Sequence, residues 1–184
     1  MVIEERIYIM PDGRAVTVRS ACAHDAAAVL EEMRITSGET YYMIRTPEEV
    51  ARITLETETE KMAALRDSPR DAFIVAECGG RIVGSAGISP ILERLRTCHR
   101  ASFGISILQE FCGGGLGGFM LQTLIGAARS IGYRQLELGV YADNPRAIHC
   151  YEKAGFTAWG TLPRAFRLDD GSFRGEVQMT LPLD

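Results

Sequence analysis

Five glycines cluster just past the middle of the chain, at positions 113, 114, 115, 117 and 118 of the run CGGGLGG. A glycine loop that is entered from a strand and left into a helix can turn its backbone N–H groups toward one point, because no side chain blocks the approach. The N-terminus of the following helix adds unpaired donors and a partial positive charge. The alternative is a flexible loop whose glycines only permit tight packing. We favour the first interpretation and predict that residues 113–118 bind a phosphate group.

The kind of phosphate compound is a separate question, because Gly113, Gly115 and Gly118 also fit the G-x-G-x-x-G dinucleotide pattern. By itself that match is weak. A dinucleotide site normally belongs to the first strand–helix–strand unit of a sheet, with several more units after it. Here the motif begins past the middle of the chain, and no G-K-[ST] follows to make a P-loop. A nucleotide-binding oxidoreductase is therefore the less favoured hypothesis.

The first half of the chain predicts the elements that precede this loop. Residues 15–19 alternate apolar and polar side chains like a half-buried strand. From Asp25 to Gly38 a helix is expected, with Ala26, Leu30 and Met33 on its apolar face. Thr46-Pro47-Glu48-Glu49 predicts a capped start for a second helix that runs to about residue 66. Residues 72–77 and 81–89 predict an antiparallel hairpin around a glycine turn.

The second half predicts a strand on each side of the long helix that leaves the glycine loop. The strands are expected at 102–108 and 135–141 and the helix at 116–131, which Gly132 ends. Asn144-Pro145 starts a further helix that ends at Gly155. Two more strands are expected around 164–168 and 176–181, joined by a turn at 169–171.

Composition limits the class of protein. The chain has 184 residues, 46% of them hydrophobic and 24% charged, which predicts one folded domain over residues 1–184. The formal charge of −4 provides no general basic field for nucleic acid or a membrane surface. Neither the five scattered cysteines nor the three histidines have metal-ligand spacing, so we expect no metal. No stretch of about 18 apolar residues occurs, and we expect a cytoplasmic protein.

Three segments together resemble the GCN5-related N-acetyltransferases, the GNAT family. They are the opening VTVRSACAHDAAAVL, ISILQEFCGGGLGGFML at 105–121, and LELGVYADNPRAIHCYEKAGF at 136–156. The resemblance implies an α/β (α+β) fold with a mixed sheet of six to seven strands, splayed between its fourth and fifth strands and flanked by about four helices. It also implies acetyl-CoA (CoA) as the cofactor and an amine of a small molecule or peptide as the substrate.

The resemblance places the cofactor along the glycine loop and the strand before it. The implied cofactor contacts are Ile105, Ile107, Leu108, Cys112, Gly113, Gly114, Gly115, Leu116, Gly117, Gly118, Asn144 and Tyr151. Cys112 departs from the family pattern, which has Arg or Gln at this position. Either the backbone alone holds the pyrophosphate, or another basic residue reaches it. An N–H of Ile107 or Leu108 would stabilise the oxyanion.

Catalysis is assigned to Tyr151 and Asn144. Tyr151 is the expected proton source for the departing thiolate, since its ordinary pKa of about 10 exceeds that of a thiol. The alternative is an aromatic ring that only packs against the sheet or the cofactor. Asn144 is either a cofactor contact or a plain N-cap, and the two roles can coexist. Cys150 and Cys112 are expected to be buried, inert thiols rather than nucleophiles.

The general base is not identified from the sequence. The family often has Glu where this chain has Ser102, and Glu137 is a candidate beside water-relayed deprotonation. Tyr41, Tyr42 and Glu39 would suit an amine ligand, although packing between the first two helices is slightly preferred. The leading hypothesis is an acetyl-CoA-dependent N-acetyltransferase acting by direct attack on the thioester, with a homodimer left open. The alternative is a non-catalytic CoA-binding regulatory module.

Overall fold

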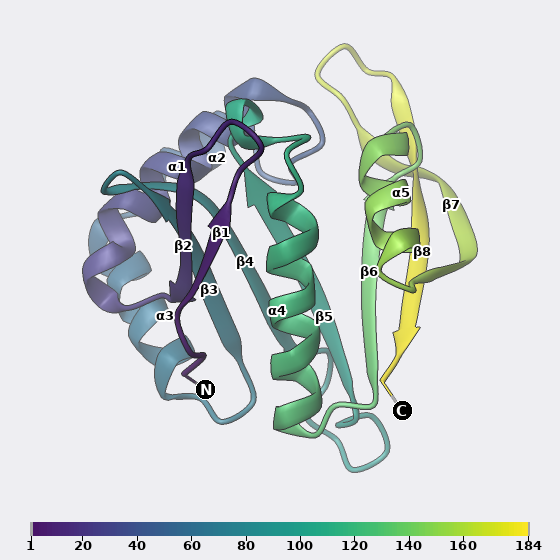
Figure 1. Ribbon diagram of the computed structural model, residues 1–184. Coiled ribbons are helices and arrows are strands. Elements are labelled where there is room, and N and C mark those ends of the chain that lie inside the picture. Colours follow the sequence, from purple (N-terminus) through teal and green to yellow (C-terminus); the bar gives the residue numbers. More distant parts are fainter. Residues whose placement is uncertain (1, 184) are drawn as a thin grey trace.

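The computed structural model describes residues 2–183, which form one mixed eight-stranded sheet flanked by helices (Figure 1). The strand order is β1-β2-β3-β4-β5-β6-β8-β7. The strands are β1 (Arg6–Ile9), β2 (Ala15–Ser20), β3 (Ala72–Cys78), β4 (Arg81–Pro90), β5 (Arg100–Ile107), β6 (Gln135–Tyr141), β7 (Thr157–Arg167) and β8 (Phe173–Pro182). The helices are α1 (Ala26–Glu39), α2 (Pro47–Val50), α3 (Leu55–Asp67), α4 (Leu116–Ile131) and α5 (Pro145–Lys153), with short 3-10 turns η1 (Ala23–Asp25) and η2 (Gln109–Phe111).

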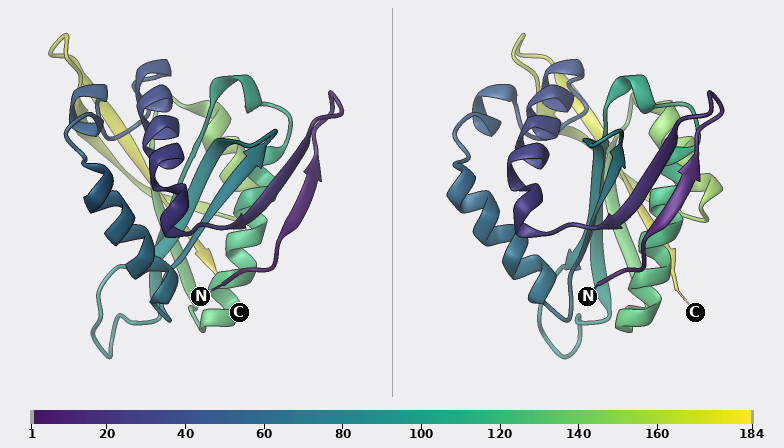
Figure 2. Two further views of the ribbon diagram at one scale, coloured as in Figure 1. Left: turned by 90° about the vertical axis from the view of Figure 1, so that its left-hand side faces the viewer. Right: turned by 60° about the vertical axis from the view of Figure 1, so that its left-hand side comes forward.

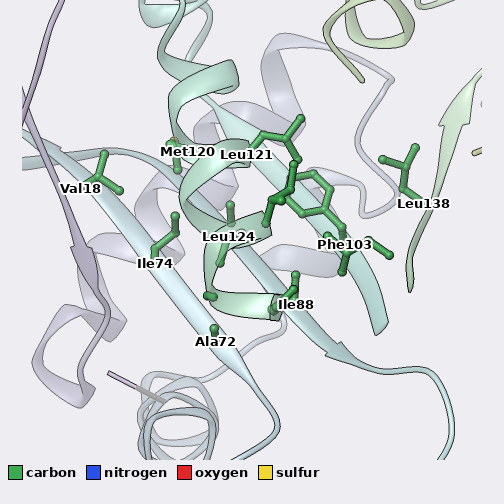
Figure 3. Close-up of a cluster of buried hydrophobic side chains, with 14 of the residues drawn as sticks. Val18, Ala72, Ile74, Ile88, Phe103, Met120, Leu121, Leu124 and Leu138 are labelled. Atoms are coloured by element: carbon green, nitrogen blue, oxygen red, sulfur yellow. The ribbon is translucent and has the colours of Figure 1, made fainter. Parts of the chain in front are cut away.

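The sheet separates two helical layers. Figure 2 shows α1 and α3 on one face and α4 on the opposite face, where α5 also lies. The larger core lies between the sheet and α4, and its side chains interdigitate around Met120, Leu121 and Leu124 of the helix (Figure 3). A smaller core lies under α1 and α3, where Val29 and Met62 are almost completely buried. Apolar side chains from the helices on both faces pack against the sheet and hold the strands that carry the site in place.

Glycines end several elements where the sequence predicted, although α1 continues through Gly38 to Glu39. Gly79 and Gly80 both have positive φ, of 58° and 81°, as a two-residue hairpin turn between β3 and β4 requires. Gly115 and Gly132 flank α4 in the left-handed conformation, with φ of 89° and 97°. A residue with a side chain rarely adopts this conformation, which explains why the predicted bounds of α4 agree with the structure.

Two expectations about the elements were wrong. The helix predicted from Thr46 to about Arg66 is two helices, α2 and α3, separated at residues 51–54. Thr46 caps α2 as predicted, but Thr54 forms a second N-cap whose side chain accepts a hydrogen bond from the Thr57 N–H at 3.2 Å. Threonine competes for backbone donors and favours such a new start over a continuous helix. The sheet also has one strand more than the six to seven expected, because β1 pairs with β2.

The pairing between β5 and β6 is short. These parallel strands pair only at Arg100↔Gln135, Ala101↔Leu136 and Ser102↔Glu137 among the described residues. Beyond this point β5 continues along β4 as far as Ile107, and β6 continues along β8 as far as Tyr141. Figure 1 shows the two strands diverging in this direction.

Candidate active site

The glycine loop leads into the N-terminus of α4 with free backbone donors. Gly113 and Gly115 have φ of 84° and 89°, which turns successive N–H groups to one side of the chain. No N–H group of residues 113–118 donates a hydrogen bond to another residue within 2–183. Gly113 and Gly115 are exposed and Gly114, Gly117 and Gly118 are half-buried. The side chain of Leu116 is buried, so this residue offers only its backbone N–H. The loop therefore has the donors of an anion site.

The N-terminal strand holds this loop in shape. The Tyr8 hydroxyl of β1 donates a hydrogen bond of 2.7 Å to the Gly114 carbonyl oxygen. A Cβ atom added at Gly114 would lie 2.6 Å from Met10 Cε, and one at Gly115 would collide with the Tyr8 hydroxyl. Glycine is therefore required at Gly115 by contact and by its φ of 89°, whereas at Gly114 only the contact with the Met10 side chain opposes a Cβ.

Arg146 brings a positive charge to the loop. Its guanidinium lies against Gly113, where an added Cβ would be 2.9 Å from Nη2. Partial burial of the sulfur raises the pKa of Cys112 overall, and the positive charge of Arg146 lowers it by a smaller amount. Arg146 is exposed on the first turn of α5. It is the basic residue that can replace the side chain missing at Cys112, and the sequence did not reveal it because α5 is distant along the chain.

The predicted strand contacts divide into two groups. The Leu108 N–H donates to the Val83 oxygen at 3.0 Å, and the side chain is fully buried, so Leu108 was wrongly predicted as a free oxyanion donor. Hydrogen-bonded pairs alternate along an antiparallel ladder. Ile105 and Ile107 therefore direct their backbone groups away from β4 and toward the opening beside β6. Cys112 Sγ contacts the Ile107 oxygen at 3.6 Å.

Tyr151 lies where the two strands diverge. Its ring packs edge-on against Phe103 with centroids 6.0 Å apart, and Phe103 directly follows the last residue of β5 that pairs with β6. Burial raises the pKa of Tyr151 well above its usual value, with a smaller contribution from Cys150. The hydroxyl therefore keeps its proton at neutral pH. The packing alternative is thus supported by the contacts with Phe103 and Phe156, and the role of Tyr151 as proton source stays a prediction.

Asn144 caps the N-terminus of α5, which confirms one of the two roles predicted for it. Its Oδ1 accepts a hydrogen bond of 3.1 Å from the Ala147 N–H. The cap fixes the first turn of α5. This turn carries Arg146, so Asn144 supports the anion site by positioning the helix. Its role as a catalytic residue stays a prediction.

Glu137 is unsuited to act as a base. Arg100 binds both of its carboxylate oxygens, and Gln135 Nε2 donates to it at 2.7 Å. The bond to Arg100 lowers the pKa of Glu137 below its ordinary value, so the carboxylate is a weak proton acceptor. Burial raises the pKa of the half-buried Cys150 thiol, in keeping with the prediction that it is inert. The prediction that Cys112 is buried was wrong, because this side chain is exposed at the end of η2.

A cavity of about 520 Å³ lies between the C-terminal end of α1 and the β7–β8 hairpin. Tyr41 lines it. Tyr41 and Tyr42 both pack against Tyr141 at the end of β6, rather than packing α1 against the next helix. Tyr41 Oη donates to Asp143 Oδ2 and Tyr42 Oη to the Asp143 oxygen, each at 2.9 Å. Glu39 also lines the cavity, and its Oε2 accepts from the Gln109 N–H at 2.8 Å. The cavity therefore lies near the ends of both diverging strands: Tyr141 ends β6, and Glu39 contacts Gln109 just after β5.

One buried carboxyl escaped the sequence prediction. Glu32 is 1% exposed and accepts a hydrogen bond of 3.0 Å from Ser85 Oγ. The fully buried residues of α1 are Ala26, Val29, Glu32 and Thr36. Of the predicted apolar face, Ala26 is buried and Met33 packs against the smaller core, whereas Leu30 is only half-buried. A glutamate in line with Ala26 and Val29 was the signal that could have revealed it.

Within residues 2–183, no group of three His, Cys, Asp or Glu side chains has the geometry to hold a metal ion. None of the helices in the described chain combines the length and apolar character needed to cross a bilayer.

Comparisons with known proteins agree with the fold and the loop. The profile of the Acetyltransferase (GNAT) family matches residues 37–156. The chain therefore belongs to the GNAT acetyltransferase family, as the sequence resemblance predicted. This match covers the glycine loop, both diverging strands and α5.

Individual relatives are more distant. The spermidine N(1)-acetyltransferase of Escherichia coli (strain K12) is 30% identical over 118 residues, which are 64% of this chain and 61% of the relative. The chain thus spans about 61% of the length of that curated relative. A GNAT acetyltransferase structure from Streptococcus pneumoniae is 26% identical with a TM-score of 0.86, covering 91% of this chain and 99% of that one. A structure from Salmonella typhimurium with acetyl-CoA has a TM-score of 0.80 at 21% identity, covering 92% and 94%.

Proposed function

We propose that this protein is an acetyl-CoA-dependent N-acetyltransferase that acetylates a primary amine of a small molecule or a protein N-terminus. The single observation that carries the proposal is the set of unbonded N–H groups at residues 113–118, placed at the start of α4 beside diverging strands. Membership of the GNAT family supports it, as does the acetyl-CoA contained in the Salmonella typhimurium structure.

The residues present fit this cofactor. The N–H groups of Gly113 to Gly118 would bind the pyrophosphate, and the Arg146 guanidinium beside Gly113 would balance its charge. The short β5–β6 ladder supports a splay that admits the pantetheine tail, whose amides Ile105 and Ile107 would bind as an added strand does. When bound, acetyl-CoA supplies the thioester carbonyl that an amine attacks.

The remaining tasks fall to the chain's own side chains. Tyr151 Oη holds a proton for the departing sulfur, and its raised pKa keeps that proton in place until it is needed. The Ile107 N–H, which faces the opening, would stabilise the negative oxygen that develops. The acceptor amine would enter from the cavity at the end of α1. We place the enzyme in the reducing cytoplasm, supported by five cysteines that are all free.

Thermal shift with CoA, acetyl-CoA, NAD and NADP tests the ligand. A compound at a hundred times its dissociation constant adds about 2.7 kcal/mol of stability, and we expect this from acetyl-CoA and CoA only. Release of free thiol from acetyl-CoA with a panel of amines, including spermidine and amino acids, tests the reaction. Stabilisation by CoA without turnover of any amine would favour the non-catalytic regulatory module, and stabilisation by NAD alone would refute the acyl-transfer assignment.

A further inference from the structure

The acyl transfer proposed above needs a proton acceptor, and Glu137 cannot supply it. An amine attacks only after its ammonium form has lost a proton. Carboxylates on the α1 face of the sheet, where the cavity lies, are the other candidates. Glu32 is the one of these, within the described residues, that is buried with an unpartnered oxygen, since Oε1 has no hydrogen-bond partner.

Two side chains, Ser85 and Ser106, connect Glu32 to the edge of β5. Ser85 Oγ lies 3.0 Å from Glu32 Oε2, and Ser106 Oγ lies 3.1 Å from Ser85 Oγ. Burial decreases along this line, because Glu32 is 1% exposed, Ser85 is 6% exposed and Ser106 is half-buried. Ser106 stands between Ile105 and Ile107 on β5, whose backbone groups face the opening beside β6. The outer end of the line therefore lies at the place where the strands diverge.

The groups around Glu32 place its pKa close to neutral pH, so it can both gain and lose a proton there. Burial raises its pKa to about 7, while the hydroxyls of Ser106 and Ser85 partly oppose this rise. Glu39, farther along α1, raises the pKa further through its negative charge. The charges on the neighbouring elements are paired among themselves: Glu58 with Lys61 on α3, and Asp25 of η1 with Arg19 of β2.

We propose that Glu32 accepts the proton of the substrate ammonium through a relay of Ser106 and Ser85. This inference rests on the proposed N-acetyltransferase function. One ammonium N–H bond breaks as its proton moves to Ser106 Oγ, the Ser106 proton moves to Ser85 Oγ, and the Ser85 proton moves to Glu32 Oε2. The amine nitrogen regains its lone pair, both serines end with one proton each, and Glu32 becomes a neutral acid that later releases the proton to solvent.

The relay differs from a structural carboxyl in its effect on the pH profile. The test measures kcat/KM against pH with an amine that the wild type acetylates, for Glu32→Gln, Ser106→Ala, Glu32→Asp and the control Glu31→Gln. Glu31 is its exposed neighbour on α1 and pairs with Arg34. We expect the wild-type acid limb near pH 7 to vanish in Glu32→Gln, with kcat/KM down about 100-fold at pH 8. We also expect partial rescue in Glu32→Asp and an unchanged KM for acetyl-CoA.

A readout without turnover accompanies these kinetics. The NMR titration of ¹³C-labelled glutamate carboxyls should show one resonance with a midpoint near pH 7 that is absent in Glu32→Gln and present in Ser106→Ala. A Glu32→Gln enzyme that keeps the acid limb, or a Ser106→Ala enzyme with wild-type kcat/KM, would overturn the relay. If Glu32→Gln does not fold, Ser106→Ala decides the matter. A wild type that acetylates no amine would instead refute the proposed function, and with it the relay.

Discussion

The buried carboxyl of Glu32 makes the stability of the protein depend on pH in a defined window. Its pKa is raised from an ordinary 4.5 to about 7 by burial. Between these values the folded protein keeps a proton that the unfolded chain has released. The contribution of this carboxyl to the free energy of unfolding is therefore fully present below pH 4.5 and is lost as the pH rises to 7. Each pH unit corresponds to about 1.4 kcal/mol. The wild type should therefore lose about 3 kcal/mol of unfolding free energy across this window relative to Glu32→Gln.

Urea denaturation of both proteins between pH 4.5 and 8.5 measures this difference. Glutamine is neutral at every pH and keeps an oxygen that can accept from Ser85, so the other titrating groups cancel in the comparison. Asp25, whose pKa is lowered to about 2 by its bond to Arg19, loses its contribution only at more acidic pH. We expect the unfolding free energy of Glu32→Gln, relative to that of the wild type, to increase steadily up to pH 7 and to stay constant above it. Two curves that stay parallel from pH 4.5 to 8.5 would refute the reasoning.

Three further predictions concern the site. Tyr151→Phe should lower kcat about 100-fold, since it removes the proton source, while leaving the Kd for CoA from calorimetry unchanged; unaltered turnover would remove Tyr151 from this role. Arg146→Ala should weaken CoA binding at least 10-fold and lower its salt dependence, because a charged hydrogen bond contributes about 1.5–3 kcal/mol, whereas Arg129→Ala at the other end of α4 should not. Gly115→Ala should destabilise the fold and abolish CoA binding, since φ is 89° and the added Cβ meets Tyr8. Gly126→Ala, with nothing within 4 Å of its added Cβ, should raise stability by about 0.5–1 kcal/mol in thermal melts.

The sequence predicted local structure well wherever glycine or a cap decided it. The bounds of α4 and β6 agree with the prediction, and Asn144 caps α5 as expected. The break between α2 and α3 was missed because Thr54 acts as a cap only once the chain turns there. Strand β1 was missed because three of its four residues are exposed, so it has no apolar alternation to reveal it.

The sequence predicted the backbone of the site, the glycine loop, but not the charged residues Arg146 and Glu32. Glycine spacing alone indicated the anion loop, because glycine there follows from a local conformational requirement. Arg146 and Glu32 take their roles from contacts with segments that are distant along the chain. The Leu108 amide was misassigned because hydrogen bonding along β5 alternates, and its phase is set by the pairing with β4.

The hydrogen bond from Tyr8 to the Gly114 oxygen has a practical consequence for work with this protein. The family profile begins only at residue 37, so a chain cut to that boundary would lose β1, β2 and most of α1 together with the hydroxyl that holds the loop. Such a fragment would keep the family signature but lose the helix that covers one face of the sheet. Expression of this protein should therefore include the N-terminal strand, and a tag should leave this strand undisturbed.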